Sequence, residues 1–67
     1  MPKRHDDPEV IKANIAHLSN EDEGIRERAA RSLGAAGSKA KESVPTLVRV
    51  LQTDQSPKVL KEASLAL

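Results

Sequence analysis

The sequence predicts an all-α fold of two stacked antiparallel helical hairpins, four helices of the α-solenoid type. Apolar residues recur at three- and four-residue spacing along most of the chain. Short polar stretches with capping residues divide that pattern into four segments. The apolar positions of the first two segments return 33 or 34 residues later. With 67 residues the chain forms one small domain.

The first helix is expected over about residues 8 to 19, after a flexible N-terminal segment at 1–7. Asp7 can cap free N–H groups, Pro8 suits the first helical position, and Glu9 meets the positive end of the helix dipole. The expected inward stripe is Val10, Ile11, Ile15 and Leu18.

The second helix follows the polar stretch SNEDEG, in which Asp22 is placed to cap its start. Its inward stripe has spacings of four, four and three: Ile25, Ala29, Leu33 and Ala36. Gly37 is expected to end it in the left-handed conformation that glycine adopts easily.

The third helix contains a proline within its apolar stripe of Ala40, Val44, Leu47, Val48 and Leu51. Ser38 offers a cap. Because Pro45 removes one backbone bond and clashes with the preceding turn, we expect a short turn at 39–43, a kink, and a helix to about 52.

The fourth helix follows the loop TDQS, where Ser56 and Pro57 repeat the pairing of a cap with a first-position proline. Its apolar positions are Val59, Leu60, Ala63, Ala66 and Leu67. Two repeat units result, at 8–37 and 38–67. The second is expected to be incomplete at its C-terminal end, because Leu67 corresponds to Leu33 and no counterpart of Gly34 follows.

The evidence for an internal repeat comes from the spacing of apolar residues more than from identical residues at matching positions. Three positions of the second helix return 34 residues later, and three of the first return 33 later: Ile25, Ala29 and Leu33 to Val59, Ala63 and Leu67; Ile11, Ile15 and Leu18 to Val44, Val48 and Leu51. The tryptophan and tyrosine of tetratricopeptide units and the TPLH turn of ankyrin units are missing, which argues against both classes.

Residues 10–67 resemble the short HEAT-like repeats of the phycobilin-lyase type. Four features occur in order: Ile25-Arg26 before Ala29-Ala30, Leu33-Gly34, Val44-Pro45 opening a helix, and Asp54 in a loop. The resemblance implies that Arg26 pairs with an acidic loop residue such as Asp54. The chain departs from the pattern where Asn14 replaces an apolar residue and where Leu60 replaces the second unit's arginine, so that unit cannot continue the ladder.

Composition excludes several kinds of site. Aromatic residues make up 0% of the chain, which removes stacking platforms for bases and sugars. Without cysteine there is no disulfide, thiolate–zinc site or cysteine nucleophile. His5 with Asp6 and Asp7 lacks a fourth ligand, Ser32 lacks a nucleophile motif and a nearby base, and His17 suits an exposed helix end. We therefore expect no catalytic, cofactor-binding or metal site.

A strip on the second and fourth helices is the candidate partner surface. At 100° per residue these positions point away from the buried stripe, and the resemblance places them on the concave side of a solenoid: Glu27, Arg28, Arg31, Lys61, Glu62 and Leu65. The alternative reading is an ordinary solvated face with a favourable Glu27–Arg31 pair. Leu65 does not fit that alternative, since it is apolar and opposite the buried stripe.

These observations favour a non-enzymatic module for protein–protein interaction or scaffolding, located in the cytoplasm because no signal peptide or membrane-spanning run is present. The last helix carries Val59, Leu60, Leu65 and Leu67 with no following unit to cover them, so we expect either a fragment of a longer solenoid or a homo-oligomer that completes its core through this exposed terminal helix. The alternatives are an accessory subunit of an enzyme such as a bilin lyase, which the resemblance implies, and a weak binder of the nucleic-acid backbone. Acidic residues interleaved among the arginines and a net charge of +1 argue against nucleic acid, and nothing indicates a membrane.

Overall fold

The computed structural model describes residues 4–67, and within that range all regular structure is helical. The elements are α1 (Pro8–His17), α2 (Glu23–Ala36), the 3-10 segment η1 (Gly37–Ser43), α3 (Val44–Thr53) and α4 (Pro57–Ala66). Its Cα radius of gyration is 10.6 Å, close to the roughly 11 Å expected for a compact chain of this length. The predicted all-α class is confirmed.

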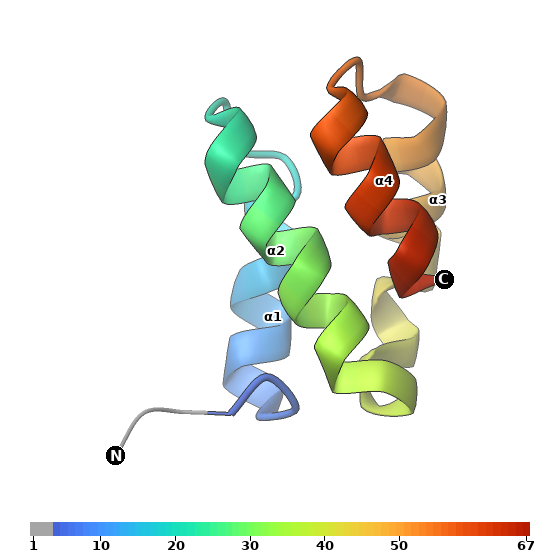
Figure 1. The fold of residues 1–67 in the computed structure, drawn as a ribbon. Coiled ribbons are helices and arrows are strands. Elements are labelled where there is room, and N and C mark those ends of the chain that lie inside the picture. Colours follow the sequence, from blue (N-terminus) through green and yellow to red (C-terminus); the bar gives the residue numbers. More distant parts are fainter. Residues whose placement is uncertain (1–3) are drawn as a thin grey trace.

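The helices form two hairpins that lie side by side (Figure 1). α1 runs antiparallel to α2, and α3 runs antiparallel to α4. In the view of Figure 1, α2 and α4 form the front layer and α1 and α3 lie behind them. The most extensive contact between the hairpins joins α2 to α4. The seam between these two helices therefore joins the halves of the molecule.

Three of the predicted helix starts carry the predicted caps. Asp7 Oδ1 accepts a hydrogen bond from the Glu9 amide at 2.9 Å. Asp22 Oδ1 accepts from the amides of Gly24 and Ile25 at 2.7 and 3.2 Å. Ser56 Oγ accepts from the Val59 amide at 3.3 Å. Each cap satisfies amides that have no partner within the helix, so these boundaries follow from local chemistry.

The join between the hairpins follows the prediction in part: the short turn expected at 39–43 and the helix expected to about 52 appear as η1 and α3. α2, η1 and α3 follow one another without a loop, so residues 23–53 form one bent helical path. Gly37 has φ +60° and ψ −134°, a positive φ outside the left-handed helical region, and Ala40 leaves helical geometry at φ −103°, ψ 30°. No side chain caps η1 or α3, so the expected Ser38 cap is absent. Pro45 lies in the first turn of α3, where its missing N–H costs little.

The core is a single cluster that draws on both hairpins. Its buried members are Ile11, Leu18, Ala29, Ala30, Leu33, Ala36, Ala40, Leu47, Val50, Val59 and Ala63, with Ile15, Leu51 and Ala66 half-buried against it. On α2 the predicted stripe is confirmed, except that Ile25 is only half-buried. One shared core fits a chain too short for two separate ones.

On α3 the predicted buried stripe is wrong at two positions. Val44 and Val48 are 43% and 39% exposed, whereas Val50, outside that stripe, is buried. The reason is geometric. α3 packs on α4 and η1 through one face, and Val44 and Val48 lie outside that face. Leu67 is likewise 54% exposed.

The Arg26 side chain links the loop between α1 and α2 to the loop between α3 and α4. Its Nε donates to Asp54 Oδ2 at 2.8 Å and its Nη2 reaches Oδ1 at 3.4 Å. Its Nη1 donates to the backbone carbonyls of Asn20 and Glu21 at 2.8 and 3.0 Å. Asp54 Oδ1 also accepts from the Ser56 amide at 2.9 Å. The Arg26–Asp54 pairing that the resemblance implies is confirmed.

At the opposite end of the seam, α2 and α4 approach closely at a glycine. A Cβ added to Gly34 would lie 3.4 Å from both Cα and Cβ of Ala66. This is ordinary van der Waals contact for a methyl group, but a longer side chain would have to displace the α4 backbone.

Replacing Arg26 with alanine should lower the free energy of unfolding by about 1.5–3 kcal/mol, the range for charge-assisted hydrogen bonds. The Asp54 side chain, only 7% exposed, would lose its cation. Arg49→Ala is the matched control, because exposed Arg49 makes one 3.3 Å bond to Ser19, and should change stability by less than about 0.5 kcal/mol. Urea denaturation measures both, and equal effects would refute the role given to Arg26.

Two glycine substitutions should change the free energy of unfolding in opposite directions. Gly34→Ala should raise the free energy of unfolding by roughly 0.5–1 kcal/mol, because alanine favours helix and its methyl group fits against Ala66. Gly37→Ala should lower it by about 1–2 kcal/mol, because Gly37 has φ +60°. Thermal denaturation of the two variants checks the signs, and destabilisation by Gly34→Ala would show that the seam is tighter than described.

Candidate functional site

The outer face of α2 and α4 carries an ion-pair cluster that spans both hairpins. Arg31 Nη2 lies 3.4 Å from Glu27 Oε2 on the same helix and 3.3 Å from Glu62 Oε2 on α4. The hydrogen bond that Arg31 donates to Glu62, then the negative charges of Glu62 and Glu27, raise the pKa of Arg31 above its ordinary value. The guanidinium therefore keeps its charge, and the structure brings together three of the six predicted surface residues.

The other three predicted residues are exposed on the same two helices. Arg28 lies one turn before Arg31, and Lys61 lies one turn before Leu65. Leu65 is 71% exposed, the highest value among the large hydrophobic residues of the described chain. Within residues 4–67, Arg28 and Lys61 make no hydrogen bond or ion pair. The face thus presents two uncompensated cations and an apolar side chain around a cluster that is internally paired.

We call this surface, formed by the six predicted residues Glu27, Arg28, Arg31, Lys61, Glu62 and Leu65, the α2/α4 face. Figure 1 shows the two helices that carry it, α2 and α4, side by side in the front layer. Glu27 and Glu62 are half-buried at its centre, and their side chains are 25% and 14% exposed. Because both carboxylates are bound to Arg31, the groups left to a partner are the cations and Leu65.

A second cluster joins the segment before α1 to α2, and sequence reasoning missed it. Ser32 Oγ lies 2.6 Å from His5 Nδ1 and accepts a 2.9 Å bond from Asn14 Nδ2. The expectation that Ser32 has no base nearby is therefore wrong. Residues 5 and 32 are 27 positions apart, and no spacing rule links them. The flexibility expected for residues 1–7 stays a prediction, and residues 1–3 lie outside the described range.

The Ser32–His5 pair does not form a nucleophilic site. Ser32 is only 8% exposed, and its hydroxyl is bound on two sides. It also lies in the interior of α2, where backbone amides are occupied by the helix and cannot form an oxyanion hole. The pair therefore holds the segment before α1 against α2, and Asn14, which replaces an apolar residue of the family pattern, is one of its hydrogen-bond donors.

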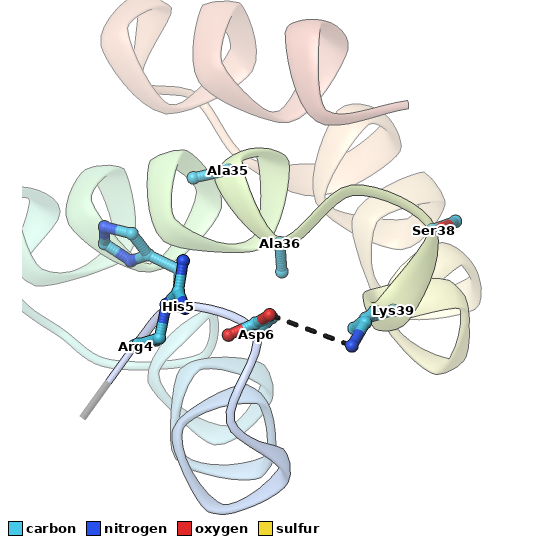
Figure 2. A pocket seen from close by; sticks show the side chains of 7 residues that line it. All are labelled: Arg4, His5, Asp6, Ala35, Ala36, Ser38 and Lys39. Carbon is cyan, nitrogen blue, oxygen red and sulfur yellow. Dashed lines mark ion pairs between the residues drawn. The ribbon is translucent and has the colours of Figure 1, made fainter.

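A cavity of about 420 Å³ lies beside this segment (Figure 2). Its walls are Arg4, His5 and Asp6 on one side and Ala36, Ser38 and Lys39 on the other. Figure 2 shows Asp6 and Lys39 facing one another across it, and their charged atoms lie 3.9 Å apart. These opposite charges pair with each other, so neither Asp6 nor Lys39 is left as an uncompensated charge in the cavity.

The other residues considered in the sequence analysis do not form a further site in the described part of the chain. His17 is exposed at the end of α1, as expected. Ser56, expected only as a helix cap, is 6% exposed and accepts a hydrogen bond from the Val59 amide. In the described part of the chain, no group of three or more metal-binding side chains comes together. Across residues 4–67 there is also no helix with the length and apolar character needed to cross a membrane.

Comparison with known families agrees with this geometry. The family model of HEAT repeats matches residues 3–67, almost the whole chain. No curated protein and no solved structure shows a significant match to the sequence. The match covers both hairpins, including the Arg26–Asp54 contact between them. The chain belongs to the HEAT-repeat family.

Proposed function

We propose that this protein is a non-enzymatic interaction module that binds a protein partner through the α2/α4 face. HEAT repeats are in general modules for protein interaction and scaffolding. The observation that carries the proposal is the arrangement around Arg31. An internally paired cluster crosses the seam, and exposed Arg28, Lys61 and Leu65 surround it.

Contacts across the seam hold the α2/α4 face in order before a partner binds. Arg31 bridges both hairpins, so the spacing between the exposed groups of α2 and those of α4 is set before a partner arrives. A surface that is already ordered loses less conformational entropy when it binds. Leu65 supplies an apolar anchor, and burial of a leucine contributes roughly 1.5–3 kcal/mol. Arg28 and Lys61 supply charges that orient the partner and accelerate its approach.

The mixed charge of the face favours a protein partner over nucleic acid. Two half-buried carboxylates lie between the cations, whereas backbone-directed nucleic-acid binding depends on continuous positive charge. No aromatic side chain is present for base stacking. The proposal also includes a cytoplasmic location and association between copies of the chain.

The face can be tested by affinity capture followed by quantitative mass spectrometry. Leu65→Asp should weaken partner binding by roughly tenfold or more, because it replaces the apolar anchor with a charge. Arg28→Glu combined with Lys61→Glu should do the same by reversing the uncompensated charges. Lys12→Glu reverses a charge at an exposed position of α1, away from the face, and as the control should retain the partner.

Circular dichroism of each variant shows whether the fold is kept. If folded variants of the face and the Lys12 control capture the same proteins in the same amounts, the proposal is wrong. A gel shift that weakens steeply with salt would indicate nucleic-acid binding instead. A new absorbance band after incubation with a bilin would indicate the accessory role in chromophore attachment.

A further inference from the structure

The acidic and basic residues of this protein are used differently. The chain has 10 acidic and 11 basic residues, nearly a balance. Within residues 4–67 most of the carboxylates already cap helices or form ion pairs: Asp6, Asp7, Asp22, Glu27, Asp54 and Glu62. The side chains with neither role are more often basic, namely Arg4, Lys12, Arg28, Lys41, Lys58 and Lys61, against Glu21, Glu23 and Glu42. The charges left free in this range are therefore mainly positive.

Three of these free cations lie on α2 and α4. Arg28 and Lys61 belong to the α2/α4 face, and Lys58 is exposed one turn before Lys61. Lys58 is in the first turn of α4, whereas α1 and α2 carry Glu9 and Glu23 in that turn. The positive end of the helix dipole disfavours a cation there. No ion pair within residues 4–67 offsets this cost, so Lys58 does not serve the stability of α4.

The carboxylates on the same two helices are not available in the same way. Glu27 and Glu62 are bound to Arg31, and their side chains are only 25% and 14% exposed. Glu23 lies in the first turn of α2, where its charge suits the helix dipole. A basic group of a partner would have to compete with Arg31 for the two central carboxylates. An acidic group can contact the free cations without breaking an existing pair.

We infer that the α2/α4 face, together with Lys58 beside it, binds a protein segment rich in aspartate and glutamate. The inference rests on the proposed function and names the chemistry of the partner. One exposed ion pair changes an affinity by only about two- to fivefold, so several carboxylates of the segment must bind together. Because these contacts are exposed, the binding weakens as ionic strength rises.

Selection from a random library of short peptides displayed on phage tests the inference without presuming a partner. The whole protein should enrich peptides that are more acidic than the starting library. The triple variant Arg28→Glu, Lys58→Glu and Lys61→Glu should enrich basic peptides instead. In fluorescence anisotropy, a synthetic copy of an enriched acidic peptide should bind this variant roughly tenfold more weakly or worse.

The matched control reverses three free cations elsewhere, through Arg4→Glu, Lys12→Glu and Lys41→Glu. It changes the net charge by the same amount and should keep the affinity for the acidic peptide. Lys58→Glu alone should weaken binding about two- to fivefold. It should not lower the melting temperature, because glutamate suits the first turn of a helix. Circular dichroism of every variant checks the fold.

The outcomes separate this inference from the proposed function. Enriched peptides that are neutral or basic, yet still depend on the face, would overturn the inference and leave the proposed function intact. Equal loss of the acidic peptide by both triple variants would indicate attraction by net charge and would also overturn the inference. Peptides whose binding ignores every change on the face, or no enrichment at all, would count against both.

Discussion

The seam between α2 and α4 is the contact on which the rest of this structure depends. Four helices with a limited aliphatic content cannot form two cores, so the hairpins share one. The seam is fixed at one end by Arg26, which binds Asp54 and two loop carbonyls. Near its other end Gly34 lets the helices approach until Ala66 is in contact. Arg31 and Glu62 add an exposed contact between these points.

The same seam also shapes the proposed α2/α4 face. This face exists only while the two helices lie side by side, and the exposed Arg31–Glu62 pair adds one contact across it. Away from the seam, the second hairpin leaves Val44, Val48 and Leu67 exposed within residues 4–67.

The sequence predicted those features that local chemistry or a repeat pattern specifies. Asp7, Asp22 and Ser56 cap the helices as expected because capping depends on a few neighbouring residues. The predicted burial of Val44 and Val48 was wrong. Their spacing shows that they share one face of the helix, but it does not show whether a neighbouring helix covers that face. The sequence also missed His5 beside Ser32, since side chains 27 residues apart meet only through tertiary packing. The six residues of the α2/α4 face remain a prediction as a binding surface.

Native-state hydrogen exchange monitored by NMR tests the central claim most directly. If one core joins the hairpins, the slowest amides of α1, α2, α3 and α4 should all exchange through the same global opening, with similar free energies and similar dependence on denaturant. A result in which the amides of α3 and α4 exchange through a separate opening, several kcal/mol less costly than that of α1 and α2, would contradict it. The hairpins would then be independent units, and the seam would not be the element that organises this protein.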